Sequence, residues 1–268
     1  MARLKGPILF TGSLGNIRSI YNKKLKRYDL STKGRASKEL IKNSPTFART
    51  RENMSEFTAC GKWASQVRKS LLSISHLFFG YYFSEIVKLA KQIQLRDESH
   101  PKGSRSIESS KIPVLLTTLN FNRSHSFDSV LSDSPEITLS EDKMKVTLTL
   151  TEFKSKLRIH WPNRFDSYRI ALVIAQLSDF VYSEIEAAFI PVIPDLEQLS
   201  VITNSEWLPN NSDPRDILLD ALFPEPALQQ PGTTVIVAMA IEISSILLKP
   251  TDSYTSQQGT LKIVECFI

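Results

Sequence analysis

The sequence predicts an α+β protein in which an N-terminal extended arm and a helical hairpin precede an antiparallel β-sandwich. Apolar residues recur at helical spacing in the first half and alternate with polar residues at strand spacing in the second. The charge changes sign where one pattern gives way to the other. We therefore expect three parts: an extended arm at 1–34, a basic helical region at 35–112 and an acidic β-sandwich domain at 113–268.

The charge is divided between two blocks of the chain. Residues 1–112 hold 22 Lys and Arg against 8 Asp and Glu, a net charge of +14. Residues 113–268 hold 11 against 20, a net charge of −9, so the whole-chain value of +5 conceals the division. Such asymmetry bears on partners and not on fold. The basic block could meet a polyanion or the acidic block of another copy.

The arm at residues 6–34 reads as an irregular hairpin. The glycines and asparagine of Gly12-Ser13-Leu14-Gly15-Asn16 tolerate positive φ and fit a tight turn or bulge. Tyr28, Leu30 and Thr32 then alternate as in a strand. Because a lone hairpin buries little surface, we expect it to lie against another element or another subunit.

Residues 44–97 have the spacing of two helices joined by a break near residues 75–80, which predicts an antiparallel helical hairpin. Ser44 can cap the first helix, and Pro45 fits its first position. Gly61 costs about 1 kcal/mol relative to Ala inside a helix, and its missing side chain would permit a close crossing. The two apolar stripes are Phe57, Cys60, Ala64, Val67, Leu71 and Ile74, and then Phe83, Ile86, Ala90 and Ile93.

Five aromatic residues crowd into the six positions 78–83 at this break. One interpretation is a core plug at the helix junction. The other is a contact patch, because exposed aromatic residues at such density usually mark interfaces. Both interpretations stay open here, and the candidate contact residues are Phe78, Phe79, Tyr81 and Tyr82.

From residue 113 onward the pattern is that of short strands. Met144, Val146, Leu148 and Leu150 alternate with polar residues, which indicates one buried and one solvated face. Several such segments separated by turn formers favour an antiparallel sandwich of the immunoglobulin or fibronectin kind. The polar stretch 95–112 is the expected linker. The further strands are expected at 113–119, 156–161, 167–177, 182–190, 234–248 and 260–267, with long loops over 191–233 and a short helical piece at 213–222.

Signatures of catalysis and of cofactor binding are absent from the sequence. The segment Gly12-Ser13-Leu14-Gly15 lacks the Gly-Lys-Ser/Thr of a phosphate-binding loop, and no Gly-x-Ser-x-Gly motif occurs. We therefore expect no catalytic residue, no cofactor and no metal, and a protein that is not an enzyme. Cys60 and Cys266 are expected to be small buried apolar residues without a disulfide. The histidines that lack metal-ligand spacing are His76, His100, His125 and His160.

The most concentrated positive charge lies in the arm, where tyrosines interleave with it. A nucleic acid would bind it through phosphate neutralisation, although no helix-turn-helix, RRM, KH or zinc-finger pattern is visible. A solvated basic face and a contact with an acidic protein surface are the other interpretations. The candidate residues for an assembly or polyanion contact are Lys23, Lys24, Lys26 and Arg27.

Several short motifs are spread along most of the chain: Lys5-Gly6, Gly12-Ser13-Leu14-Gly15-Asn16, Thr32-Lys33-Gly34, Asn120-Phe121-Asn122, Phe127-Asp128-Ser129-Val130-Leu131 and Glu206-Trp207-Leu208. They resemble those of a group of uncharacterised proteins common in Bacteroidota. The resemblance implies the same layout of arm, helical part and β-rich part, and it implies no activity. Arg35 stands where the family pattern Lys-Gly-Gly has a second glycine.

These observations predict a non-enzymatic structural protein that self-associates into a fibre or tube through arm or strand exchange and basic-to-acidic contacts. The alternative is a nucleic-acid-binding or phage-related accessory protein that uses the basic half. The expected partners are other copies of the chain or a nucleic acid. No membrane span is expected, since no apolar stretch is long enough. Without a signal peptide the expected compartment is the cytoplasm, or wherever an assembly lacking a leader is released.

Overall fold

A computed structural model describes residues 2–3, 6, 9–32, 36–211, 213–224, 231–245 and 258–268. The chain divides into two compact units, residues 1–51 and residues 52–268. This division does not coincide with the expected boundaries after residues 34 and 112. The helices expected to form a separate region share one hydrophobic core with the strands that follow them.

The first unit is a small antiparallel sheet with the strand order β1-β4-β3-β2, followed by short helical segments. The predicted hairpin is confirmed for β3 and β4, which pair from Ile17 opposite Thr32 to Asn22 opposite Arg27. Residues 1, 4–5, 7–8 and 33–34, which the predicted arm also included, lie outside the described residues. The elements are β1 (Ala2–Arg3), β2 (Gly12–Leu14), β3 (Ile17–Asn22), β4 (Arg27–Thr32), α1 (Lys38–Asn43) and η1 (Pro45–Phe47).

This first unit has almost no interior. Among its described side chains, Ser19 is the only buried one. Large apolar side chains instead face the solvent, because one small sheet cannot cover them. Those most exposed on the sheet and its turns are Leu14, Ile17, Ile20, Tyr21 and Leu25.

The second unit contains the remaining elements in chain order. They are α2 (Ala48–Ser70, in this unit from residue 52 onward), η2 (Leu72–Leu77), α3 (Tyr82–Gln94), η3 (Ser109–Lys111), η4 (Pro113–Thr118), α4 (Phe127–Val130), β5 (Glu136–Leu139), β6 (Lys145–Phe153), α5 (Ser155–Arg158), β7 (Ser167–Ser178), β8 (Phe180–Ser183), β9 (Ala188–Pro191), η5 (Leu196–Gln198), β10 (Val201–Asn204), β11 (Leu208–Pro209), β12 (Arg215–Leu222), β13 (Thr233–Ser244) and β14 (Gly259–Phe267).

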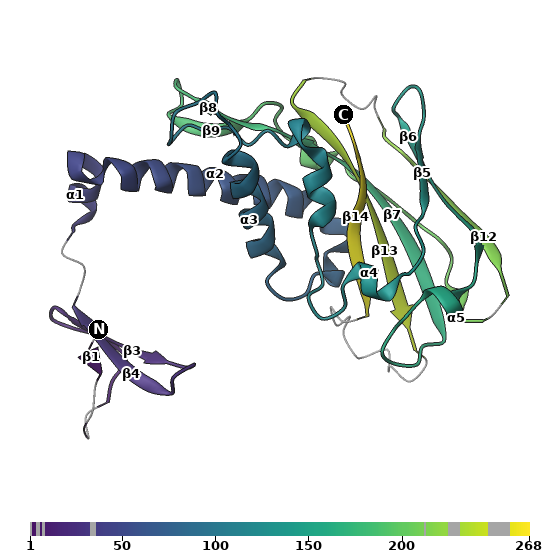
Figure 1. Cartoon of the computed structure of the whole chain (residues 1–268), viewed down its shortest axis with the longest axis horizontal. Coiled ribbons are helices and arrows are strands. Elements are labelled where there is room, and N and C mark those ends of the chain that lie inside the picture. Colours follow the sequence, from purple (N-terminus) through teal and green to yellow (C-terminus); the bar gives the residue numbers. More distant parts are fainter. Residues whose placement is uncertain are drawn as a thin grey trace. The chain divides into compact units, whose positions relative to one another are not determined.

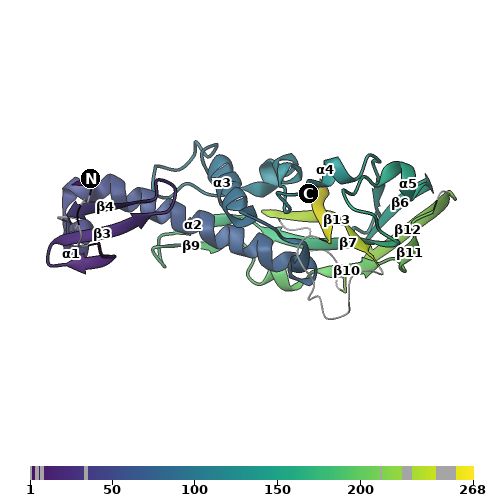
Figure 2. The same cartoon turned by 90° about the horizontal axis from the view of Figure 1, so that it is seen from below.

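These elements form three layers. Figure 1 shows α2 and α3 beside a central sheet that contains β14, β13 and β7, and then a second sheet of β5, β6 and β12. The central sheet has the order β10-β7-β13-β14, with β11 also paired to β7. Figure 2 gives the same layers from below. Helices together with antiparallel sheets confirm the α+β class.

The central strands are buried on both faces, because each face has its own covering layer. In β7, Val173 and Ala175 belong to the core beneath the helices, whereas Leu172 and Ile174 belong to the core between the sheets. The alternation has the period of two that a strand imposes. β13 pairs with β7 along its whole length, from Thr233 opposite Ser178 to Ser244 opposite Ser167. The strands predicted at 167–177 and 260–267 are confirmed as β7 and β14.

Three predicted elements were wrong. Residues 113–119 form the 3-10 helix η4, in which Pro113 takes an early helical position that suits its fixed φ. Residues 156–161 hold the end of α5 and a single bridge at Ile159. The expected helical piece at 213–222 is strand β12, whose burial alternates residue by residue.

The strand predicted at 182–190 is the hairpin of β8 and β9. The strand predicted at 234–248 is β13, with residues 246–248 outside the described residues.

The predicted linker at 95–112 is built into the second unit. Ile107 is buried, and its backbone exchanges hydrogen bonds of 2.8 and 3.0 Å with Phe180. Asp97 is also buried and accepts the backbone N–H of Ser106 at 2.7 Å. Hydrogen-bonded polar residues therefore occupy the interior here, and their polarity in the sequence did not indicate a linker.

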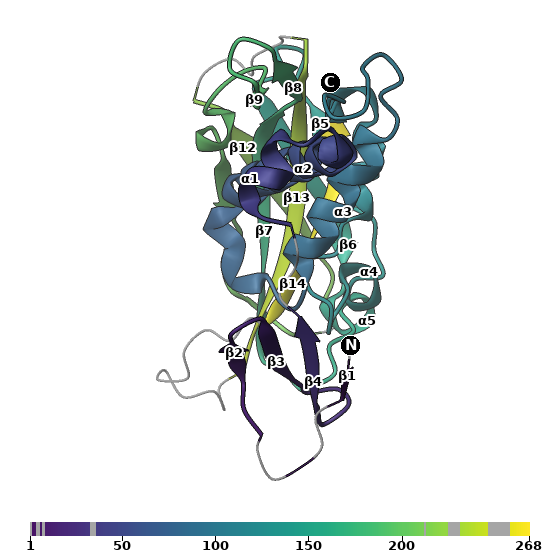
Figure 3. The ribbon, with the colours of Figure 1, turned by 90° about the vertical axis from the view of Figure 1, so that its left-hand side faces the viewer.

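The two helical stripes are buried except where each begins. In the first stripe Phe57 is 65% exposed, while Cys60 and the residues after it are buried. In the second, Phe83 is 38% exposed and Ile86 is buried. Figures 1 and 3 show the α3 ribbon crossing α2, so the two helices do not form the antiparallel hairpin that the stripes predicted.

Gly61 gives the first testable prediction, because a Cβ atom there would meet nothing within 4 Å. The close helix crossing suggested by this glycine is therefore absent at this position. We expect Gly61→Ala to stabilise the protein by about 1 kcal/mol, since glycine is the poorer helix former. Thermal unfolding followed by circular dichroism should show a Tm about 2–4 °C higher. An unchanged or lower Tm would contradict the open surroundings of this residue.

Candidate functional site

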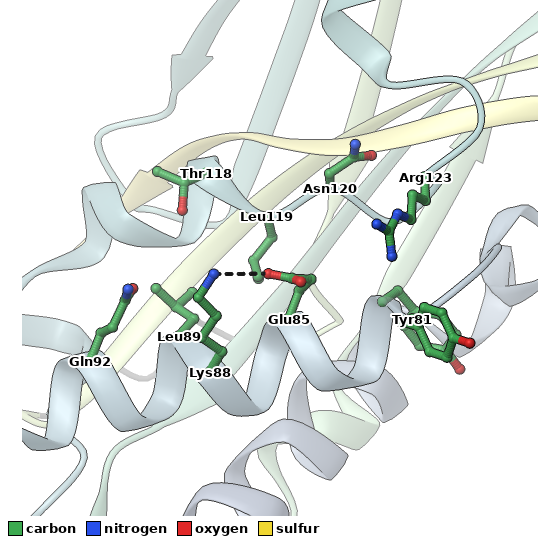
Figure 4. A pocket seen from close by; sticks show the side chains of 10 residues that line it. Tyr81, Glu85, Lys88, Leu89, Gln92, Thr118, Leu119, Asn120 and Arg123 are labelled. Atoms are coloured by element: carbon green, nitrogen blue, oxygen red, sulfur yellow. Dashed lines mark ion pairs between the residues drawn. The ribbon is translucent and has the colours of Figure 1, made fainter. Parts of the chain in front are cut away.

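Three adjoining cavities form a trough on the second unit. The first, of about 440 Å³, lies between α3 and residues 118–123 (Figure 4). The next, of about 290 Å³, shares Thr118, Leu119 and Asn120 with the first. The last, of about 250 Å³, shares Asp128 and Lys262 with the second. The trough therefore runs from α3 to the neighbouring edges of β14 and β5.

One wall of the trough is the outer side of α3. Glu85, Lys88 and Gln92 are spaced by three and four residues, so they share a helix face and project along the trough (Figure 4). Buried Leu89 and Leu119 form an apolar floor between the walls. Glu85 and Lys88 form an exposed ion pair at 3.6 Å, which leaves this wall close to neutral.

Tyr81 and Arg123 meet at one end of the trough (Figure 4). The Arg123 guanidinium lies 5.8 Å from the centroid of the Tyr81 ring, within the range of a cation–π contact. Backbone hydrogen bonds hold the two segments together, since Phe79 N–H donates to Phe121 at 2.9 Å and Arg123 N–H donates to Phe79 at 3.3 Å. Gly80 adopts φ 83° between them, a conformation that glycine tolerates best.

Asn122 shapes the turn that presents Arg123. Its side-chain oxygen accepts the N–H groups of Ser124 and His125 at 3.0 and 3.1 Å, and its amide donates to the Gly259 carbonyl at 2.8 Å. The side chain is fully buried. This Asn therefore ties the end of the trough to β14, a role that the Asn-Phe-Asn motif did not reveal in the sequence.

The opposite end of the trough is acidic. Asp128, Asp133 and Glu265 line it together with one cation, Lys262, whose Nζ donates to both Asp128 oxygens at 2.7 and 2.8 Å. Arg158 lies 3.6 Å from Asp133. The apolar residues that line this end are Phe127, Ile137 and Val264.

A buried carboxylate fixes α3 against α2. Glu56 is fully buried and accepts hydrogen bonds from Arg105 at 2.7 and 2.8 Å, from the Gly103 N–H at 2.8 Å and from Lys91. Burial alone would raise the pKa of this carboxyl group. The bonds from Arg105, Gly103 and Lys91 outweigh it and lower the pKa to about 2. The cluster positions the helix that forms one wall of the trough.

A second buried carboxylate joins the central strands. Glu242 accepts two hydrogen bonds from Arg169 at 2.7 and 2.8 Å, and the His76 ring lies 3.6 Å away. Burial would raise the pKa of Glu242, but the neighbouring His76 ring and the hydrogen bonds from Arg169 outweigh it and lower the pKa. Arg169 also lies 5.0 Å from the centre of the Trp207 ring system. These contacts satisfy a charge inside the sheet, and we assign them a structural role.

The structure separates the predicted lysine and arginine residues. Lys23, Lys24 and Lys26 are exposed on the turn between β3 and β4, where they surround the exposed Leu25. Arg27 instead donates to Asp29 at 2.9 Å within the sheet. The prediction thus grouped three residues that lie together on the turn and one that is paired with a carboxylate of its own strand.

The predicted aromatic cluster is also divided: Phe78 fits the core interpretation, and the contact-patch interpretation stays a prediction for the exposed part. Phe78 is buried and stacks on Phe121 with ring centroids 5.3 Å apart. Phe79 is half-buried. Tyr81, which is 71% exposed, and the half-buried Tyr82 line the trough. Sequence reasoning did not find Arg123, which carries no periodic or motif signal.

Both cysteines are free thiols. Cys60 is buried, as expected, and burial raises its pKa to about 11. Cys266 is half-buried, and burial raises its pKa to about 12. Within the part of the chain that the structure describes, no group of three His, Cys, Asp or Glu residues could hold a metal ion. None of the described helices is long and apolar enough to cross a membrane.

No protein-family model, curated protein or solved structure matches this chain. The fold alone defines the class, which is an α+β protein whose second unit has three layers and a surface trough. The resemblance to a Bacteroidota family stays a prediction.

Proposed function

We propose that this chain is a non-enzymatic structural protein that self-associates head to tail into a fibre or tube. The observation that carries the proposal is the partition of charge between the two units. Residues 1–51 hold 13 Lys and Arg against 2 Asp and Glu, a net charge of +11. Residues 52–268 hold 20 against 26, a net charge of −6. A contact between unlike surfaces repeats from copy to copy.

The exposed apolar side chains of the first unit support this contact. Leu14 is 71% exposed and Leu25 is 55% exposed, although both lie in or beside a sheet. Burying such a side chain against a partner contributes about 1.5–3 kcal/mol. The charge would steer the encounter between copies, and this apolar surface would stabilise the bound state.

Strand exchange is part of the same proposal. β2 is an edge strand of the sheet in the first unit, and β5 is an edge strand of the sheet β12-β6-β5 in the second unit. Neither outer edge carries a further strand among the described residues. Open edges accept strands from other chains. We further propose that the two packed sheets of the second unit form a sandwich of the immunoglobulin kind, and that the protein assembles in the cytoplasm or where such an assembly is released.

Light scattering of the purified full-length protein across a salt series tests the proposal. We expect a mass well above that of one chain at low salt, falling toward one chain as salt screens the contact. Negative-stain microscopy of the low-salt sample should show elongated particles. A single-chain mass at high protein concentration and low salt would refute self-association.

Nucleic-acid binding is the second candidate, because aromatic residues lie among the cations of the first unit. The Tyr21 and Tyr28 rings lie 4.9 Å apart, close to the lysine-bearing turn. Bases stack on such rings while lysines neutralise phosphates. Fluorescence anisotropy with non-specific DNA and RNA at low salt decides this candidate. Saturable binding that weakens steeply with salt would support it, and no binding at low salt would exclude it.

A further inference from the structure

We propose that the acidic end of the trough binds the turn between β3 and β4 of a second copy. The inference rests on the proposed self-association and names the two surfaces that meet. The donor, called here the lysine turn, is Lys23-Lys24-Leu25-Lys26. The acceptor is the cavity of about 250 Å³ between β14 and β5.

The lysine turn is a preformed projection. The Asn22 side-chain oxygen accepts the N–H groups of Lys24 and Leu25, both at 3.1 Å. Lys26 adopts φ 47°, which closes the turn in the left-handed region. The turn therefore presents one apolar side chain among three ammonium groups. A partner that binds it loses little conformational entropy in ordering the backbone.

The acceptor has complementary chemistry and enough room. Its volume is several times the roughly 30 Å³ that one water occupies in the liquid, so a leucine side chain can enter. Ile137 and Val264 supply apolar contacts for that side chain, and carboxylates surround them. This combination selects an apolar group flanked by cations, which is what Leu25 and its neighbouring lysines provide.

Glu265 is the carboxylate most available to a partner. Asp128 already binds Lys262, and Asp133 lies 3.6 Å from Arg158. Among the described residues Glu265 has no cationic partner, and its side chain accepts only the neighbouring Cys266 N–H. An incoming lysine therefore gains a new ion pair there.

The position of the acceptor favours a protein partner over a nucleic acid. It lies where the central sheet ends at β14 and the second sheet ends at β5. The outer edge of β5 carries no further strand among the described residues, and open sheet edges are common docking places for protein segments. Phosphates would be repelled by Asp133 and Glu265. Because every copy carries one donor and one acceptor, the contact repeats and generates an open chain unless the rotation closes a ring.

Charge reversal in the full-length protein tests the inference. Lys23→Glu with Lys24→Glu should raise the dissociation constant of self-association at least tenfold, measured by sedimentation at low salt. Asp133→Lys with Glu265→Lys should raise it by a similar factor. Combining all four substitutions in one chain should restore association. Mixing the two double variants should also restore it, because each then supplies the complement of the other.

Matched controls separate this contact from general electrostatics. Lys38→Glu with Lys42→Glu changes the net charge equally within the same unit, on the exposed face of α1. This control should weaken association much less than reversal of the lysine turn. Glu265→Lys alone repeats the acceptor test at an exposed position, should Asp133→Lys disturb the fold beside Arg158. Circular dichroism verifies folding of each variant.

The outcomes distinguish this inference from the proposed function. The wild-type protein could associate while reversal of Lys23 and Lys24 weakens association no more than reversal of Lys38 and Lys42, or while the fourfold variant fails to associate. Either result would mean that the lysine turn does not bind this acceptor, although self-association itself would stand. If the fourfold variant regains only the folding stability of the single chain, and the mixture of the two double variants stays monomeric, then a second copy does not occupy the acceptor. A wild-type protein that is monomeric at low salt overturns the proposed function itself.

Discussion

Replacing Glu56 with alanine is expected to lower the free energy of unfolding by about 3–5 kcal/mol. The carboxylate is fully buried and is the common acceptor for Arg105, Lys91 and the Gly103 N–H. Without it, two cations lose their partner in a partly desolvated site, since the side chains of Arg105 and Lys91 are only 16% and 36% exposed. Urea unfolding of the two proteins measures the difference.

Glu85→Ala is the matched control on the neighbouring helix. Glu85 pairs with Lys88 at 3.6 Å, but both side chains are more than half exposed. Such a surface pair is worth about 0–1 kcal/mol, so its loss should barely change the urea midpoint. Equal effects of Glu56→Ala and Glu85→Ala would contradict the buried role of Glu56.

The same carboxylate has a defined effect on acid stability. Its pKa falls from 4.5 to about 2 on folding, so the folded state favours the ionised form. The stabilisation is fully present above pH 4.5 and is lost as the pH falls toward 2. Unfolding free energies measured between pH 5 and pH 2 should therefore decline less steeply in Glu56→Gln than in the wild type. Parallel curves would show that Glu56 does not titrate as the structure requires.

The predictions that succeeded depend on patterns that local sequence contains. Burial of Cys60, Ala64 and Val67 follows from the helical period of α2. The long strand β7 follows from an unbroken apolar run that only a doubly covered strand needs. The segment at 213–222 failed for a different reason. Ile217 and Leu219 are inward residues of an edge strand, but the proline- and asparagine-rich surroundings suggested a loop with one helical turn.

The candidate site shows the same distinction. The lysine turn was found because its residues are consecutive in the chain. The acidic end of the trough was not found, since Asp128, Asp133 and Glu265 come together only when β14 reaches the segment that follows η4. Arg123 reaches Tyr81 through a backbone pairing of residues 79 and 122, which no periodicity announces. Both arrangements depend on which distant segments lie side by side in the fold, and local patterns in a single sequence do not reveal that order.

Gly259→Ala is expected to destabilise the protein by about 2–3 kcal/mol through overpacking. A Cβ atom at this position would collide with the Ile241 carbonyl oxygen on the paired strand β13. It would also lie 2.8 Å from the Leu77 side chain and 3.1 Å from the Glu242 Cα atom. A backbone carbonyl held in a strand ladder cannot turn aside, so β13 and β14 must separate. Urea unfolding measures the loss.

Gly61→Ala is the control for this substitution, because the same change in an open helix position should stabilise by about 1 kcal/mol. If the same glycine-to-alanine change raises the free energy of unfolding at one position and lowers it at the other, the difference comes from the steric surroundings of the two positions. The Gly259 carbonyl also accepts the Asn122 amide at 2.8 Å, and Asn122 holds the turn that presents Arg123. Displacement of β14 should therefore loosen that end of the trough, measurable as faster amide hydrogen exchange at residues 122–125. A Gly259→Ala variant as stable as the wild type would mean that these strands are not so closely paired.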